Sequence, residues 1–590
     1  MKCGEPVLQR RSARKVILIF FLACLSRNQS SAQSTSTETS DSLRGTVINS
    51  VTHEPIGRAL VSSPDNRFAT LTDSEGRFEF TLPKAETNLE RGLNSGLSSS
   101  GSVQIINMLM ARKPGFLTDQ NSPFQNLQNV TGKEVTIPLI PEALIVGTVT
   151  LPTAEAPDSI FLQIYRRQVQ EGRAHWVPAG GTQSRSDGEF RFADLPAGTY
   201  KLLTRELLDR DPLTSDPRGQ QYGYPPAYSQ NAPDFVTAGT IHVSAGETGL
   251  VNLALVKRPY YRVKISVANV APDAGINVNV YALGRQGPGF ALGYNNRDQA
   301  IEGLLPNGIY TIEASTFGPN STAGLLTLTV KGAAVEGPRM TMAQVGSIDV
   351  NVTEQFTSDD HTGISTITAN GRSVTLNGPR RYLNLWLESD DDFERGGNVG
   401  LRTPTKAGDA SLVVENVRPG RYWVRVNSSR GFAASVHSGS VDLLRQPLLV
   451  DTSGSVSPIE ITMRDDTAEI SGTVDGVTGS ASTPIDATDG VATSYPRLGA
   501  TEAAAHIYCI PLPDSSGQFT EIWVSPDGSF TSPPLPPGAY RLLAFDRPQP
   551  ELEYRNPDAM KAYDTKGPVV RVASGQKENV RLQLISTSEQ

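Results

Sequence analysis

The chain has 590 residues, which is too long for one hydrophobic core and predicts roughly four to six domains. Hydrophobic residues make up 38% and charged residues 19%, a composition too apolar for a wholly disordered chain. The 53 glycines and 41 prolines indicate many turns between short strands and argue against a helical bundle. The net charge of -8 lacks the basic character of a nucleic-acid-binding protein, so we expect no nucleic-acid partner.

The first 32 residues have the three parts of a secretory signal peptide. A basic stretch ends at Lys15, the apolar run 16–25 follows, and the small residues 30–32 supply a cleavage site. We expect export to the periplasm, the cell surface or the medium, a linker over residues 33–42, and no membrane span after cleavage. Two alternatives stay open. One is an uncleaved anchor, although the apolar run is short for a hydrocarbon layer of roughly 30 Å. The other is lipidation at Cys24.

Cysteine usage indicates that packing alone stabilises the exported chain. Of the three cysteines, Cys3 and Cys24 lie in the signal peptide, so only Cys509 remains and no internal disulfide can form. Cys509 sits in an apolar run with no His or Asp pattern beside it, and we expect a buried strand cysteine.

The first repeated unit is expected over residues 43–141. It opens with the β-branched strand 45–47, and an acidic turn that ends in glycine leads into the run 77–82. Every second side chain of that run is aromatic or aliphatic, which predicts a strand with one buried face. A Ser/Gly-rich insertion over residues 84–102 then replaces the next step of the pattern.

The second unit, residues 142–257, contains the clearest copy of the pattern. An Asp-Gly turn precedes the alternating strand 189–192, and the Leu-Pro-x-Gly turn 195–198 reverses the chain into a strand at Tyr200. Proline presets φ at the second position of such a turn and glycine suits the fourth, so the pattern predicts a meander.

The later units repeat this pattern in whole or in part. Units three and four keep only its second half, at 304–310 and 416–422, whereas unit five has all of it at 525–542. The apolar residue before each turn recurs roughly every 110 residues, which is the ordinary size of a β-sandwich. These anchor residues are Leu82, Leu195, Leu305, Val417 and Leu535. The remaining units are expected over residues 258–343, 344–465 and 466–590.

Taken together, these motifs resemble the carboxypeptidase regulatory-like domain. The resemblance rests on the opening Gly-Thr-Val at 45–47, Glu-Pro-Ile at 54–56, the acidic-Gly-aromatic run 72–80, and Leu-Pro-x-Gly-x-Tyr at 195–200. It covers units one, two and five well and units three and four in part. It implies an all-β, tandem array of five Greek-key β-sandwiches of the transthyretin-like (prealbumin-like), carbohydrate-binding-like fold. It also implies a binding or spacer role at the bacterial envelope, and it brings no catalytic residues.

The chain carries no recognisable catalytic motif. Zinc hydrolases need two or three ligands held together, as in His-x-x-Glu or His-Glu-x-x-His, and neither pattern occurs. A nucleophile elbow and a phosphate-binding loop are missing too. We therefore expect no enzyme, no cofactor and no metal. Acidic runs at 359–360 and 390–392 leave calcium binding open, although solvated loops are the commoner outcome.

Two long connections, 206–240 and 546–567, carry the candidate binding residues, because long loops on a rigid scaffold are where binding usually resides. Exposed tyrosines could stack on sugar rings. Alternatively they fold back and cover a sandwich edge, and we prefer this second interpretation. The candidate binding residues are Tyr222, Tyr224, Tyr228, Tyr554 and Tyr563.

The sequence therefore predicts an exported, non-enzymatic string of five sandwiches that acts as an extended binding or spacer protein. An alternative is a carbohydrate-binding protein that uses the Tyr-rich loops of units two and five. A further alternative is a hydrolase, or an accessory to one, with an unrecognised site. The expected partner is an envelope or extracellular glycan or protein.

Overall fold

The computed structural model is built almost wholly of β-strands, as the sequence predicts. The helical elements of the described residues are short: α1 (Pro557–Met560), η1 (Ser229–Asn231), η2 (Gly378–Arg381) and η3 (Lys561–Tyr563). Among these residues no helix has the length and hydrophobicity that a membrane span requires. The predicted signal peptide lies outside them. The structure describes residues 42–63, 68–81, 108–117, 127–129, 134–153, 156–157, 159–209, 219–269, 275–282, 287–316, 321–358, 366–369, 372–390, 399–404, 409–451, 456–477, 505–512, 515 and 517–586.

All five units share one arrangement around their opening strand, which lies between an antiparallel neighbour and a parallel one that closes the unit. Parallel pairing of the first and last strands requires a long connection, and a second sheet provides it. The opening strands are β1 (Ser42–Asn49), β8 (Ala143–Thr150), β18 (Arg258–Ala268), β26 (Gly346–Gln355) and β37 (Glu469–Asp475). The antiparallel neighbours are β4 (Arg77–Thr81), β11 (Glu189–Leu195), β21 (Ala300–Pro306), β31 (Leu412–Val417) and β40 (Ser529–Thr531). The parallel neighbours are β7 (Glu134–Leu139), β16 (Thr248–Leu250) with β17 (Leu253–Ala254), β24 (Val335–Thr341), β36 (Ile459–Arg464) and β43 (Lys577–Ile585).

A second group of strands faces each opening strand and completes the sandwich. In unit five the two groups join into one sheet, because β41 also pairs with the closing strand β43. The predicted fold class, a tandem array of five β-sandwiches, is confirmed. In spatial order, the second group of unit one is β3 (Ala69–Leu71), β2 (Leu60–Ser62), β5 (Met108–Arg112) and β6 (Leu127–Asn129), and that of unit two is β10 (Arg173–Gln183), β9 (Phe161–Gln170), β12 (Gly198–Thr204) and β15 (Ile241–Val243). The second group of unit three is β19 (Asn277–Ala282), β22 (Gly308–Ser315), β23 (Thr322–Val330) and β25 (Ala343–Gln344), and that of unit four is β30 (Val399–Gly400), β29 (Leu383–Ser389), β32 (Gly420–Ser428) and β35 (Leu448–Val450). The second group of unit five is β39 (Thr520–Val524), β38 (Ala505–Pro511), β41 (Gly538–Phe545) and β42 (Val569–Val572).

Most of the remaining strands extend these sheets, whereas β27 (Thr366–Ala369) and β28 (Arg372–Thr375) pair with each other in a separate two-stranded sheet. Among the strands that extend the sheets, β14 comes from the segment assigned to unit two yet pairs with β18 of unit three. The predicted long connection 206–240 thus adds two strands to the neighbouring sheet, because β13 (Leu207–Leu208) pairs with β14. The exact domain boundaries stay a prediction. The remaining strands are β13 (Leu207–Leu208), β14 (Gln221–Tyr224), β20 (Gly293–Asn295), β27 (Thr366–Ala369), β28 (Arg372–Thr375), β33 (Phe432–Ser438) and β34 (Val441–Asp442).

The repeated tyrosine has a structural role that explains the sequence signature. In units two to five its hydroxyl donates a hydrogen bond to the carbonyl oxygen four residues earlier, at the start of the turn that precedes its own strand. The bond therefore ties the turn to the strand that follows it. The four donor–acceptor pairs are Tyr200 with Pro196, Tyr310 with Pro306, Tyr422 with Arg418, and Tyr540 with Pro536.

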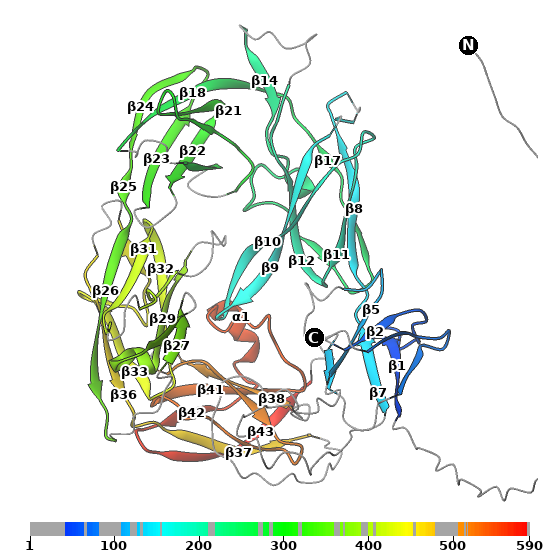
Figure 1. Cartoon of the computed structure of the whole chain (residues 1–590), viewed down its shortest axis with the longest axis vertical. Coiled ribbons are helices and arrows are strands. Elements are labelled where there is room, and N and C mark those ends of the chain that lie inside the picture. The colour runs from blue at the N-terminus through cyan, green and yellow to red at the C-terminus, as the bar shows by residue number, and fades with distance from the viewer. Residues whose placement is uncertain are drawn as a thin grey trace, which may run out of the picture.

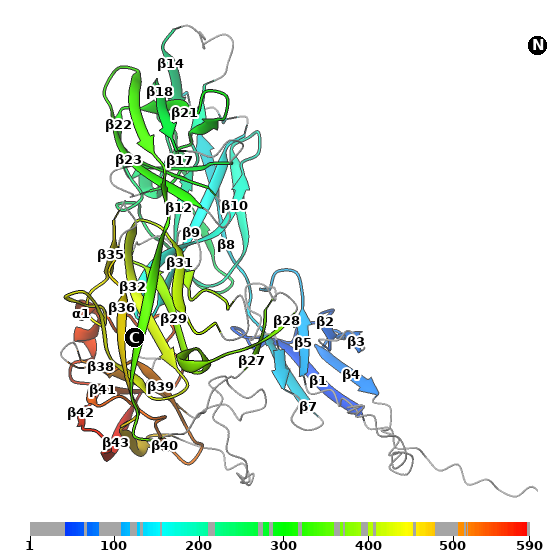
Figure 2. The same cartoon turned by 60° about the vertical axis from the view of Figure 1, so that its left-hand side comes forward.

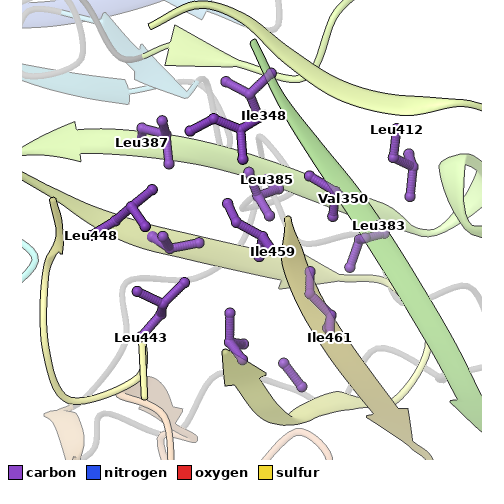
Figure 3. Close-up of a cluster of buried hydrophobic side chains, with 14 of the residues drawn as sticks. Ile348, Val350, Leu383, Leu385, Leu387, Leu412, Leu443, Leu448, Ile459 and Ile461 are labelled. Atoms are coloured by element: carbon purple, nitrogen blue, oxygen red, sulfur yellow. The ribbon is translucent and has the colours of Figure 1, made fainter. Parts of the chain in front are cut away.

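Each unit has its own apolar core. Five separate clusters of buried side chains form, and each draws its members from one unit. Figure 3 shows the core of unit four, where β26, β29 and β36 contribute Ile348, Leu385 and Ile461. Burial of one such side chain contributes about 1.5–3 kcal/mol. The described anchors of the repeat, Leu195, Leu305, Val417 and Leu535, are also buried.

Cys509 lies on β38 inside the core of unit five, as predicted. Its side chain is 0% exposed. Burial raises the pKa of its thiol to about 12, so the thiolate does not form at neutral pH.

The units are not strung out in a line. Figure 1 shows units two to five, from cyan through green and yellow to red, following one another around a closed ring. Figure 2 shows unit one, in blue, beside this ring. The expectation of an extended string is therefore wrong for units two to five. The physical reason is a long hairpin of unit two, β9–β10, which reaches units four and five.

Candidate binding site

A two-stranded arm projects from unit two. Strand β12 pairs with β9 only from Leu162 to Arg166, and β10 pairs with β9 alone. Beyond Arg166, no strand in the described part of the chain pairs with the hairpin as a third strand. An isolated two-stranded hairpin is marginally stable in water, so contacts elsewhere must hold this arm, which we define as residues 167–175. We call its contacts with units four and five the latch.

The tip of the arm is shaped to fit an aromatic ring of unit five. Glu171 and Gly172 both have positive φ, 47° and 72°, as a tight hairpin turn requires. A Cβ at residue 172 would lie 2.7 Å from the ring of Tyr554, which stacks on Phe519 with centroids 4.1 Å apart. The amide of Arg555 donates a hydrogen bond to the Gly172 carbonyl, at 3.1 Å. The Tyr554 ring is thus held between the tip and unit five.

Arg173 joins the arm to unit four. Its guanidinium donates to Asp390 at 2.9 Å and lies over the Trp423 ring, 3.8 Å from the centroid. Asp390 also accepts a hydrogen bond from the Trp423 indole and pairs with Arg421 at 3.1 Å. This carboxylate is therefore surrounded by protein cations. The other acidic positions considered as possible calcium ligands, 359–360 and 391–392, lie outside the described residues.

Three buried ionisable side chains meet where the arm crosses unit four. His175, Glu388 and Arg425 are 8%, 5% and 7% exposed. The Nε of Arg425 donates to Glu388 at 2.5 Å, and the Nε2 of His175 lies 3.7 Å from the other Glu388 oxygen. A buried charge is tolerated only when it is paired, and Arg425 of unit four supplies this pairing for Glu388. His175 of the arm lies beside this buried ion pair.

A further ion pair joins the arm to unit five. Arg167 donates to Glu553, which also accepts from Asn556. Burial by itself would raise the pKa of Glu553, but these hydrogen bonds outweigh it and lower the pKa. The latch is thus mainly ionic, in contrast to the five cores.

Units two, three and four line an open cavity of about 1220 Å³. Unit two supplies Gln163 and Arg205, unit three supplies the strand β19, and unit four supplies Asn416 and Tyr422. Asn416 also accepts a hydrogen bond from Ser321, at 3.0 Å, which links units three and four at the wall. Ligand pockets usually measure about 300–1,000 Å³, so this cavity is large enough for a sizeable ligand.

Glu206 fixes the junction between units two and three at the cavity wall. Its carboxylate accepts a hydrogen bond from the Ala291 amide at 2.8 Å, and its own amide donates to the Gly289 carbonyl at 3.1 Å. Burial raises the pKa of Glu206 to about 7, although the bond from Ala291 acts in the opposite direction. Sequence reasoning missed this residue, since nothing in its local pattern distinguishes it from a solvated glutamate.

The cavity and the latch share three strands. On β29, Ser389 lines the cavity, whereas Glu388 takes part in the latch. On β32, Tyr422 lines the cavity, whereas Trp423 takes part in the latch. Neighbouring side chains of a strand point to opposite faces, so one strand can serve both places. Strand β9 also takes part, through cavity residues near its start and Arg167 further along. The geometry of the cavity therefore depends on the position of the arm.

The structure does not gather the five tyrosines predicted to bind. Tyr222 on β14 is 41% exposed, with the Lys257 Nζ 5.5 Å from its ring centroid, and Tyr224 is half-buried. Tyr228 is only 3% exposed and packs in a cluster with Phe235. The ring of Tyr563 contacts Phe545 edge-on, at 5.8 Å.

The preferred interpretation, that these aromatics fold back on the sandwiches, fits Tyr228 and also Tyr554, whose ring lies against the arm. A binding role for the set stays a prediction. In the part of the chain that the structure describes, no group of three or more His, Cys, Asp or Glu side chains could hold a metal ion.

Comparisons with known proteins gave neither a matching family model nor a matching curated protein. Among solved structures, the Bacillus anthracis TIE protein is similar over 51% of this chain and 50% of that one, with 14% identity and a TM-score of 0.14. The chain thus matches half the length of that protein. A shaft pilin SpaA from Lactobacillus rhamnosus GG matches 37% of this chain and 98% of its own, with 11% identity and a TM-score of 0.17. A streptococcal ancillary pilin matches 55% and 99%, with 12% identity and a TM-score of 0.17. Sequence identities and TM-scores as low as these do not indicate a function for this chain.

Proposed function

We propose that the chain is an exported, non-enzymatic binding protein, built of carboxypeptidase regulatory-like modules, whose ligand binds in the cavity between units two, three and four. The observation that carries this proposal is the cavity of about 1220 Å³, walled by three units. Ligand sites occur preferentially at such domain junctions. The signal-peptide pattern of the first 32 residues supports an exported location, in the periplasm, at the cell surface or in the medium.

A binding role accounts for the ring better than a spacer role does. A spacer gains reach from units placed end to end, whereas the latch folds unit two back onto units four and five. Closing the ring shortens the molecule and brings unit two to the same cavity as units three and four. The partner is then an envelope or extracellular molecule that enters this space.

The test is a thermal-shift screen of the purified exported chain against three soluble panels: envelope oligosaccharides, peptides, and small amphiphiles. Each binder is measured again on the blocked variant Asn279→Trp, which places an indole on β19 at the cavity wall. Asn351→Trp, at an exposed position of β26, is the matched control. A binder that is lost in the first variant and kept in the second supports the proposal. The proposal is contradicted if the binders still bind the Asn279→Trp variant, or if no compound in any panel binds.

A second candidate function is carbohydrate binding by the Tyr-rich connections. It is favoured by the exposed ring of Tyr222, beside which Lys257 supplies a hydrogen-bond donor. Replacement of Tyr222 and Tyr224 by Ala tests it, and Tyr228 is left intact because it is part of a packed cluster. Loss of glycan binding in this double variant, with the blocked variant unaffected, would place the site here instead of in the cavity.

A further inference from the structure

The cavity wall carries no large excess of either charge. Arg205 and Arg418 contribute two positive groups, and Glu206 and Glu313 contribute two carboxyl groups. Recognition of phosphate-rich or strongly acidic molecules needs an excess of Lys and Arg, and recognition of a polycation needs the reverse. The wall therefore suits a ligand with little net charge.

Four side-chain amides on the cavity wall suit such a ligand. Gln163 enters from β9, Asn416 from unit four, and Asn277 and Asn279 from β19. Asn277 and Asn279 are two positions apart, so their side chains leave the strand on the same face. Each amide carries a donor and an acceptor, which is also the property of a hydroxyl group. A surface of this kind can bind several hydroxyls in a row.

Aromatic side chains complete the wall. Tyr422, Tyr281 and Phe290 line the cavity beside these amides. The ring of Tyr422 is oriented by the hydrogen bond from its hydroxyl to the Arg418 carbonyl, at 2.9 Å, and Phe290 packs edge-on against Tyr310, at 5.2 Å. Aromatic faces offer apolar, polarisable surfaces, and a pyranose ring presents C–H groups that pack on them.

The backbone of the cavity strands offers little to an extended peptide. A peptide bound by strand addition needs an open sheet edge. Strand β9 lies between β10 and β12, β22 between β19 and β23, and β32 between β29 and β35. Strand β19 is an edge strand, but a β-bridge joins its Val280 to Phe290. The edge strands β13 and β30 also line the cavity, but each is only two residues long, and the edge strand β31 is bridged through Val414 to Leu401. Recognition in this cavity must therefore come mainly from side chains.

We propose that the ligand of this cavity is a neutral oligosaccharide, bound by the amides of β19 and the facing units. This inference rests on the proposed function, because it names the class of ligand for the same site. It differs from the Tyr-loop candidate in placing the sugar inside the ring.

The experiment uses the full exported chain on an array of neutral and acidic oligosaccharides, followed by calorimetric titration of the best ligand. The variant Asn277→Ala/Asn279→Ala removes two amides from one face of β19, and Asn351→Ala is the matched control on an exposed strand position outside the cavity. Net loss of two hydrogen bonds weakens binding about tenfold or more. We expect neutral glycans to bind, the double variant to bind at least about tenfold more weakly, and the control to bind within about twofold of the parent.

Several results would overturn the inference. Binding of acidic glycans alone, or of no glycan, excludes a neutral saccharide. A peptide that binds and is lost in Asn279→Trp would leave the proposed function standing and refute the ligand class. Glycan binding that survives both the double substitution and the block would refute the cavity as the site, and so the proposed function as well. Unchanged circular dichroism and melting temperature of the double variant show that its fold is intact.

Discussion

The core of unit four and the latch stabilise the molecule in opposite ways. The core is made of aliphatic side chains from alternating strand positions, and its counterpart recurs in every unit. The latch occurs once among the described residues and consists of Arg167, Gly172, Arg173, His175 and their partners, most of them ionisable. Apolar burial is non-directional and adds up with area, whereas a buried ion pair must repay the desolvation of its charges. The cores therefore determine whether each unit folds, and the latch determines how the units are arranged.

The largest expected effect is in the core. Leu385 on β29 is 0% exposed and packs in the centre of unit four. Leu385→Ala should lower the free energy of unfolding of this unit by about 2–5 kcal/mol, because it removes buried methyl groups and leaves a cavity. Denaturant titration followed by intrinsic fluorescence measures the change. The exposed substitution Asn351→Ala should change the free energy of unfolding by less than about 0.5 kcal/mol. Equal changes for Leu385→Ala and Asn351→Ala would contradict the assignment of Leu385 to the core.

The next effect separates the latch from the cores. Gly172→Ala puts a methyl group against the Tyr554 ring and forces an L-residue to φ 72°. Gly332→Ala is the matched control, since its φ is 70° and nothing lies within 4 Å of the added Cβ. Both should lose about 1 kcal/mol to backbone strain, but only Gly172→Ala should open the ring. Small-angle scattering distinguishes them by a larger radius of gyration for Gly172→Ala alone.

A smaller effect tests the repeated tyrosine. Tyr540→Phe keeps the ring in the core of unit five and removes the hydroxyl that donates to the Pro536 carbonyl, at 2.6 Å. We expect a loss of about 0.5–1.5 kcal/mol in unit five, with no change in the radius of gyration. If the ring of units opened, the tyrosine would have a role in arranging the units, and the division of roles between cores and latch would be wrong.

The smallest effect concerns pH. The pKa of Glu206 is raised to about 7 in the folded chain, above its ordinary value of 4.5, so the folded form holds this proton more tightly than the unfolded form. Stability should therefore rise as pH falls from about 7 to about 4.5. Glu206→Gln should remove this part of the pH dependence of the melting temperature. Identical pH profiles for parent and variant would show that Glu206 is not buried at the junction of units two and three.

The contrast between the cores and the latch also explains which features the sequence predicts. Alternating side chains and the apolar surroundings of Cys509 are local patterns of a few residues. The structure confirms the strands and the buried thiol that these patterns predict. The tyrosine was recognised as a marker, although its hydrogen bond to the turn was not.

The ring and the cavity could not be predicted in this way. The arm is a polar stretch that reads as a solvated hairpin, and its partners are remote: Arg173 and Asp390 are 217 positions apart, and Arg167 and Glu553 are 386 apart. No local sequence pattern indicates such a remote ion pair, because in the sequence each of these residues resembles an ordinary charged surface residue. The cavity combines residues from three units in the same manner.

One spin-label distance shows whether the arm closes units two to five into a ring. Cys509 is buried and should not react, so the pair Gln170→Cys on the arm and Lys561→Cys on unit five can be labelled selectively. Pulsed electron resonance should give a single narrow, short distance that broadens and lengthens when Gly172→Ala is added. A broad, long distribution in the parent chain would mean that the units form an open string, which would contradict both the closed ring and the role of the latch.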